Sequence, residues 1–336
     1  MKHLLNSLLL VLLLASLGEA HPIFTREPAG STPLTDCPMD ITVCNAVRNT
    51  VVFDRWYDLY NNATIISDGS EPASPPTVLD SYMDNARPCL SNPPGAVFMN
   101  CAVGGGQTGY ISGAARRELF VGLMFKINSN YSCSYVGASK VFFVRTIDNP
   151  LGSVRTNGVF LIQGCGSVKN IIWSHNTGGG LDNSHQCPSD LGLACYANVG
   201  SGAIVAGQWT KIEVCIRDSS CPTCRDGVVK WWINGQPSGS YTQFNYGSGN
   251  VNEFVQNQTW DGYGNGQGFS TPSHQMFGHV YISAPGNGGC LTGTGSGGTT
   301  PPPPIGPVDD PAGNPSAPVG LIVSGLDELN LLEEFK

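Results

Sequence analysis

Short runs of apolar, β-branched and aromatic residues recur through the middle of the chain, and Gly, Asn, Pro or Ser bounds each run. Such runs are typical of β-strands, and none shows sustained helical periodicity. The strongest predicted strands are 118–127, 140–147, 158–164, 169–175, 209–217, 227–235 and 276–283. So many strands within roughly 240 residues predict one all-β domain of two packed antiparallel sheets, a jelly-roll sandwich.

Alternation within these strands predicts which face of the sheet each side chain occupies. In strand 227–235 it assigns Trp231 to the core and Trp232, with Lys230, to the wetter face. The core side of strand 209–217 consists of Thr210, Ile212, Val214 and Ile216. The core side of strand 276–283 consists of Met276, Gly278, Val280 and Ile282.

Composition divides the chain into five segments. Residues 1–20 have a polar start, a short apolar run and small residues up to Ala20, which predicts a secretory signal peptide. An irregular segment (21–45), the sandwich domain (46–284), a Gly/Thr/Pro-rich linker (285–318) and a short C-terminal tail (319–336) follow. We expect a secreted, extracellular protein, because the apolar run is too short to span a bilayer.

All twelve cysteines lie beyond the signal peptide, and an even number in an exported chain predicts up to six disulfides. Cys221 and Cys224 have the spacing of half a zinc site, but no second such pair exists, so a structural disulfide is favoured over metal or redox use. Glycosylation sequons begin at Asn62, Asn130 and Asn257, which predicts a glycoprotein where the host has the machinery.

The strand sequences also resemble a known group. "GQWTKIEVCIRD", "DGVVKWWINGQPSGSYTQF" and "HQMFGHVYIS" resemble the closing strands of concanavalin A-like domains of the polysaccharide-lyase-like group, which includes heparin-lyase-I-like and glucuronan-lyase-like proteins. "RRELFVGLMFKINSNY", "SKVFFVRT" and "SPPTVLDSYM" resemble earlier segments of the group. The resemblance covers residues 51–284 and implies a sandwich whose concave sheet binds an extended glycan.

This resemblance makes β-elimination next to a uronate the leading hypothesis. The reaction needs a group that neutralises the carboxylate, a base and an acid. His279 and Tyr281 share the face opposite the core set, and Gln275 continues that face outward. His175 and Arg145 complete the candidate catalytic set, with Lys140 at opposite parity to Arg145. No signature of the alginate-lyase-like relatives matches residue by residue.

The alternative is a glycan-binding or adhesion module without catalysis, in which aromatic faces stack on sugars. Trp232 and Trp173 are the candidate platforms, with Lys230 and Lys211 as polar contacts. The partner in either case is an extracellular polysaccharide. The net charge of −8 and the absence of a basic cluster argue against nucleic acid and anionic membranes. We expect a monomer.

Other chemistries fit the sequence less well. Glycoside hydrolysis needs two close carboxylates, but the glucanase strand motif is missing, and Glu213 beside Lys211 and Arg217 fits a surface charge pair. Signal cleavage would leave His21 as an N-terminal copper chelator, the remote alternative of a copper monooxygenase. No cofactor is required. Calcium is a weak alternative, at the loops that hold Asp182, Asn183, Asp261 and Asn265.

Overall fold

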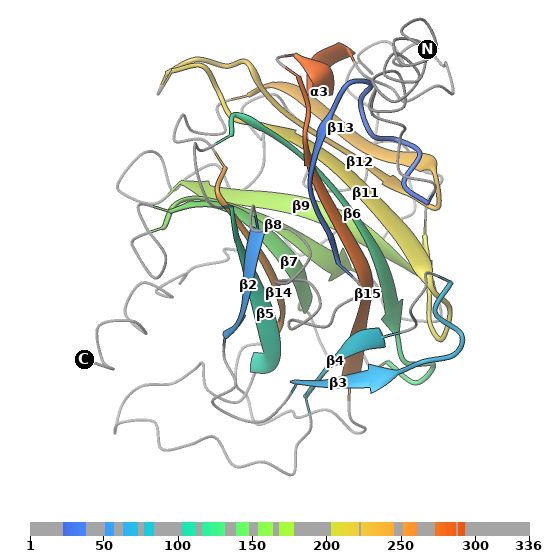
Figure 1. Ribbon diagram of the computed structural model, residues 1–336. Helices are drawn as coiled ribbons and strands as arrows, with labels where there is room; N and C mark the ends of the chain where they lie inside the picture. Colours follow the sequence, from blue (N-terminus) through green and yellow to red (C-terminus); the bar gives the residue numbers. More distant parts are fainter. Residues whose placement is uncertain are drawn as a thin grey trace, which may run out of the picture.

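The computed structural model describes 23–37, 51–56, 63–72, 77–83, 103–111, 116–131, 139–147, 154–163, 168–177, 203–221, 223–244, 251–260, 273–286 and 288–292. These residues form an all-β sandwich of two antiparallel sheets, shown in Figure 1. Sheet A has the order β13-β12-β11-β6-β15-β4-β3, and β1 also pairs with β15. Sheet B has the order β10-β9-β8-β7-β14-β5-β2.

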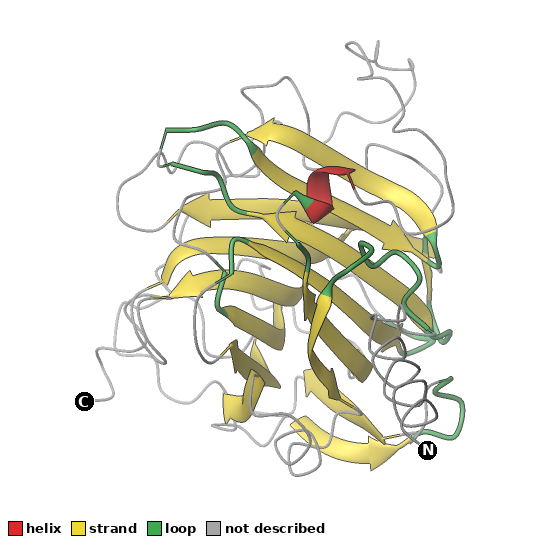
Figure 2. Cartoon of the chain, turned by 45° about the horizontal axis from the view of Figure 1, so that its top comes forward, coloured by secondary structure: helices red, strands yellow, loops and turns green. Residues whose placement is uncertain are grey.

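The strands of sheet A are β1 (Thr32–Cys37), β3 (Ala63–Ser67), β4 (Thr77–Met83), β6 (Glu118–Ile127), β11 (Thr210–Arg217), β12 (Gly227–Ile233), β13 (Gln236–Phe244) and β15 (Ser273–Ala284). The strands of sheet B are β2 (Val51–Trp56), β5 (Val103–Ile111), β7 (Ser139–Ile147), β8 (Val154–Gln163), β9 (Val168–Thr177), β10 (Ile204–Val205) and β14 (Glu253–Trp260). One short helix, α3 (Gly289–Thr292), follows β15 within the described residues. Figure 2 shows it beside the strands.

The core lies between the two sheets, as alternation within the strands predicts. Trp231 is fully buried, and its ring meets that of Phe160 edge-on at 5.9 Å between centroids, which joins sheet A to sheet B. The core faces of β11 and β12 are confirmed: Ile212, Val214 and Ile216, with Val229 and Ile233, belong to the core cluster. The Asn234–Gly235 turn, with φ of 51° and 76°, joins β12 to β13 in the manner expected of an Asn-Gly hairpin.

All seven strands predicted from the sequence are present, but irregular pairing changes several assignments of faces. In β15 the register shifts between Phe277 and Val280. Phe277 therefore belongs to the core and packs on Phe125, whereas the predicted core residue Met276 lies outside the core cluster. Gly278, also assigned to the core side, faces outward, since a β-carbon there would meet Glu71 and Met124. The extra residue of a bulge shifts the alternation by one, so residues before the bulge occupy the face opposite to the one that strict alternation predicts.

The segment 21–45, predicted to be irregular, contributes strand β1 to sheet A. β1 runs antiparallel to the second half of β15, from Thr32 opposite Ala284 to Cys37 opposite Val280. The signal peptide and the C-terminal tail lie outside the described residues. Within the part of the chain that the structure describes, no helix is long and apolar enough to cross a membrane.

Candidate functional site

The outer face of sheet A carries most of the residues that the sequence singles out, and it is covered. Residues 23–31, which we call the N-terminal strap, lie on it before the chain enters β1. Phe24 of the strap is fully buried. A second hydrophobic cluster forms beneath the cover, separate from the main core: Phe24, Phe120, Met124, Cys215, Val228, Trp232, Tyr281 and Cys290.

His279 and Tyr281 share this face, as predicted, but both are sealed by the strap and β1. Tyr281 is 3% exposed, stacks on Phe24 at 6.0 Å between ring centroids, and donates a hydrogen bond to Glu27. Burial, together with the hydrogen bond to Glu27, raises the pKa of the Tyr281 hydroxyl, which therefore stays protonated. His279 Nε2 contacts the carboxylate of Asp36 in β1.

The predicted substrate-binding residues of sheet A are also engaged by the cover. Trp232 is 5% exposed and belongs to the second hydrophobic cluster. Lys211 Nζ donates to the Ile23 carbonyl at 2.8 Å, and Lys230 Nζ donates to the Leu291 carbonyl at 3.0 Å. Burial lowers the pKa of Lys230, although the charge of Glu118 opposes the shift. The expectation of an open, wet face is therefore wrong for these residues.

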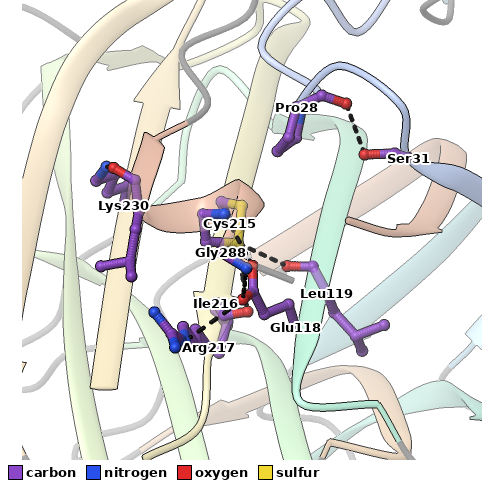
Figure 3. The surroundings of a disulfide bond; sticks show 11 residues. Pro28, Ser31, Glu118, Leu119, Cys215, Ile216, Arg217, Lys230 and Gly288 are labelled. Atoms are coloured by element: carbon purple, nitrogen blue, oxygen red, sulfur yellow. Dashed lines mark hydrogen bonds and ion pairs between the residues drawn. A yellow bond between two sulfur atoms is a disulfide. The ribbon is translucent and has the colours of Figure 1, made fainter. Parts of the chain in front are cut away.

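A disulfide closes the other end of this face. Cys215 of β11 is bonded to Cys290 of α3, and both are fully buried. Figure 3 shows the carboxylate of Glu118 beside this disulfide, where it accepts hydrogen bonds from the backbone nitrogens of Gly288 and Cys290 at 2.6 and 2.9 Å. Arg217 lies 3.4 Å from Glu118 on the other side.

Glu213 is likewise part of the covered face and not a surface charge. It is fully buried, accepts a hydrogen bond from the backbone nitrogen of Arg26 at 2.7 Å, and lies 3.5 Å from Lys211 Nζ. Burial raises the pKa of its carboxyl, against the lowering effect of these partners. The strap thus covers sheet A through both apolar and charged contacts.

Gln275 does not continue the face of His279. Because of the bulge in β15, Gln275 lies on the core side with Phe277, opposite Ile127 and Ser81 in the neighbouring strands. It is fully buried, and its amide donates to the Tyr131 hydroxyl at 3.2 Å. The predicted outward placement of Gln275 is wrong.

Arg145 lies on a different surface, the outer face of sheet B. Its neighbours in β7, Val144 and Phe142, belong to the core, so Arg145 and Phe143 point the other way. The Arg145 guanidinium carbon lies 4.2 Å from the centre of the Phe143 ring, and Nη1 lies 3.8 Å from the carboxylate of Glu253 in β14. The side chains of Arg145 and Glu253 are 3% and 4% exposed.

Strand pairing extends this ion pair into a polar row across sheet B. Residues directly opposite one another in an antiparallel pair share a face. The register aligns Tyr110 with Glu253, Glu253 with Arg145, and Arg145 with Asn157, which in turn pairs with Asn176. We call these five positions, in β5, β14, β7, β8 and β9, the polar row. The side chains of Arg145 and Glu253 are described, and the other three positions are placed by backbone register.

The remaining candidates of sheet B divide between its two faces. Trp173 pairs with Phe160, which belongs to the core, and His175 pairs with Gly158, two residues before Phe160. Both positions are therefore on the core side of sheet B, opposite to Arg145. Lys140, in contrast, pairs with Leu161 in β8. Leu161 and Asn157 are four residues apart in that strand and therefore share a face. The bulge beside Val141 thus places Lys140 on the same face of sheet B as the polar row. The predicted opposite parity of Lys140 and Arg145 is therefore wrong. The side chains of Trp173, His175 and Lys140 are outside the described residues.

Sequence reasoning missed four members of the polar row: Tyr110, Glu253, Asn157 and Asn176. Tyr110 and Glu253 lie in strands remote in sequence from β7, whereas Asn157 and Asn176 lie in the next two strands along the chain, just outside the predicted bounds 158–164 and 169–175. Only the pairing of the strands shows that all four align with Arg145. Two strands, β5 and β14, were not predicted because Gly and polar residues interrupt their alternation. The one signal in the sequence was a polar residue, such as Arg145, within an otherwise apolar strand.

Within the described residues no group of three or more His, Cys, Asp or Glu side chains could hold a metal ion. His21 and the proposed calcium loops around Asp182 and Asp261 lie outside the described residues, so copper and calcium stay untested.

Comparison of the sequence with models of protein families and with curated proteins gives no match. The structure is similar to those of several sandwich-fold polysaccharide lyases. An alginate lyase, Aly36B, solved with an alginate trisaccharide, has a TM-score of 0.47 and 13% identity, covering 75% of this chain and 97% of its own. The endo-β-1,4-glucuronan lyase of the fungus Trichoderma reesei has a TM-score of 0.40 and 13% identity, covering 67% and 88%. The binding domain of botulinum neurotoxin C1 has a TM-score of 0.40 and 8% identity, covering 76% and 49%.

Proposed function

We propose that the chain is a secreted polysaccharide lyase-like protein, which engages a uronate-containing glycan on the outer face of sheet B. The observation that carries this proposal is the polar row, in which the backbone register aligns the positions of Tyr110, Glu253, Arg145, Asn157 and Asn176 across five neighbouring strands. On the outer face of sheet A, Lys211, Lys230 and Trp232 are engaged by the N-terminal strap and α3. Arg145 and Glu253 are equally buried, but they contact one another within sheet B.

The row offers the chemistry of β-elimination from a small set of residues. Arg145 neutralises the uronate carboxylate, which stabilises the charge that develops when the C5 proton leaves. Tyr110, next to Glu253 in register, is the residue for proton transfer to and from the reacting sugar. Asn157 and Asn176 are the positions that hydrogen-bond a neighbouring sugar unit.

Phe143 and Glu253 position Arg145. The ring of Phe143 supports one face of the guanidinium, and Glu253 holds one edge at 3.8 Å. Both charges are almost out of water, so each interaction with the guanidinium is stronger than it is in bulk solvent. A sugar reaches Arg145 only after local opening at this place, so we expect binding that is slower than diffusion.

A binding module without catalysis is the second candidate. The observation that favours it is the same burial, because the guanidinium is already paired with Glu253. In that case the polar row orients a bound glycan, and the ion pair between Arg145 and Glu253 stabilises the pairing of β7 with β14.

A depolymerisation screen separates the two candidates. The purified mature protein is incubated with alginate, glucuronan, heparin-type glycans, pectin and neutral glucans, and ultraviolet absorbance reports unsaturated sugar ends. The lyase proposal predicts a rise with one uronate polymer. Tyr110→Phe should reduce that rate by about 100-fold or more while retention on an immobilised polymer persists. Retention without any rise in absorbance establishes the binding module, and neither result on any polymer overturns both.

A further inference from the structure

The Cys221–Cys224 disulfide differs from the Cys215–Cys290 disulfide in position. Cys221 and Cys224 lie in the turn between β11 and β12, are both half-buried, and flank the exposed Thr223. Cys215 of β11 and Cys290 of α3 are both fully buried. A thiol in solution can therefore reach the first pair in the folded protein, whereas the second requires its cover to open.

The two disulfides also differ in the number of residues between their cysteines. The stabilisation that a disulfide supplies by restricting the unfolded chain grows with the length of the loop it closes. Cys221 and Cys224 are three residues apart, and Cys215 and Cys290 are 75 residues apart. The shorter bridge therefore restricts few conformations of the unfolded chain, and stability alone is a weak reason for its presence.

The turn is held by other bonds, so its shape does not depend on the sulfur–sulfur bond. The backbone nitrogen of Cys224 donates to the Cys221 carbonyl at 3.0 Å. Asp226 accepts from the backbone nitrogen of Ser220 at 2.7 Å and pairs with Arg117. Reduction would leave two thiols close together in a preorganised turn, ready to form the bond again.

A hydroxyl group distinguishes the two sulfurs. Thr223 Oγ1 lies 3.6 Å from Cys221 Sγ. A disulfide sulfur carries no proton, so the hydroxyl is the donor, and the same contact would stabilise a thiolate on Cys221. Cys221 is thus the better leaving group, and Cys224 is the sulfur that an incoming thiolate attacks.

We propose that Cys221–Cys224 is a thiol–disulfide exchange site that accepts two electrons from an external dithiol. A thiolate of the dithiol attacks Cys224 Sγ, the Cys221–Cys224 bond breaks, and Cys221 leaves as a thiolate. The second thiol of the reductant attacks its own sulfur in the mixed disulfide and releases Cys224. The dithiol is oxidised to a disulfide, and its two protons end on Cys221 and Cys224. This activity is independent of glycan binding.

Graded reduction of the folded protein tests the proposal. The full mature chain is treated with increasing dithiothreitol without denaturant, alkylated, digested and analysed by mass spectrometry. We expect Cys221 and Cys224 to be alkylated at least about tenfold faster than Cys215 and Cys290, with the circular dichroism of the native protein retained. Reduction of both pairs together, or only after unfolding, would overturn the proposal.

Variants separate exchange from a structural role. Cys221→Ala with Cys224→Ala should melt within about 3 °C of the parent, and a much larger loss would show a structural disulfide. Thr223→Val should slow reduction by about threefold or more, whereas the matched control Thr223→Ser keeps the hydroxyl and the rate. Equal rates in both variants would contradict the role of Cys221 as the leaving thiolate.

Discussion

Gly122 allows the strap to approach the outer face of sheet A. A β-carbon at this position would lie 2.4 Å from the ring of Phe24, closer than atoms in contact can be. The absence of a side chain on β6 therefore makes the space that Phe24 fills, and Tyr281 stacks on the same ring. Alternation predicts the face of Gly122 but not what covers it.

Replacement of Gly122 by alanine should therefore destabilise the fold through Phe24. We expect Gly122→Ala to cost about 1–3 kcal/mol in the free energy of unfolding, because the ring must move from a packed site. Chemical denaturation measures the cost, and Phe24→Ala provides the matched background, in which the added methyl group has room. Additive costs in the double variant would show that the two residues do not meet.

Asp68 gives a pH dependence that can be measured. Burial alone would raise the pKa of this carboxyl, but hydrogen bonds from Lys126 and Ser70 and the charge of Lys126 outweigh it and lower the pKa from 3.8 to about 2. The pKa is lower in the folded state, so the stabilisation is present above pH 3.8 and is lost as the pH falls toward 2.

Asp68→Asn should remove this part of the acid sensitivity. The pair with Lys126 is partly exposed, so we expect less than about 1 kcal/mol of difference between parent and variant, confined to acid pH. Denaturation at a series of pH values measures it, with Lys126→Gln as the control that removes the main partner. An identical acid slope in parent and Asp68→Asn would contradict the assignment.

At the scale of elements, the sequence predicted the existence of strands better than their pairing. The strands rich in β-branched and aromatic residues were all found, because their apolar faces are needed to fill the core. Bulges in β7 and β15 reversed the expected faces of Lys140 and Gln275. Gly278 lies within the bulge of β15, and a glycine inside a strand is the kind of local signal that marks one. Burial of His279 and Tyr281 depends on a segment more than 200 residues earlier, which periodicity cannot reveal.

The link between β11 and α3 is the covalent part of the cover on sheet A. Loss of the Cys215–Cys290 disulfide should cost about 2–4 kcal/mol, since it closes a long loop and holds α3 against Glu118. Thermal unfolding of Cys215→Ala with Cys290→Ala measures this, and Cys221→Ala with Cys224→Ala serves as the matched control. Equal melting temperatures for the two double variants would show that the long bridge does not hold the cover in place.

At the scale of the whole molecule, the two sheets present different outer faces. Sheet A is closed by the strap, β1 and α3, and its polar side chains bind that cover. Sheet B carries a line of polar positions at the centre of its outer face. The fold class was predictable from the sequence, but the choice between the faces required the structure, because both contain cationic and aromatic residues.

Binding and cleavage by Arg145 and Tyr281 variants test the choice of face most directly. On the polymer that the depolymerisation screen identifies, Arg145→Gln, made with Glu253→Gln so that no charge is left unpaired, should lower cleavage or retention by about 100-fold or more. Tyr281→Phe, which changes only the covered face, should keep cleavage and retention within about twofold of the parent and cost stability alone. The opposite pattern, with function lost in Tyr281→Phe and kept in the Arg145 variant, would contradict the account and place the site on sheet A.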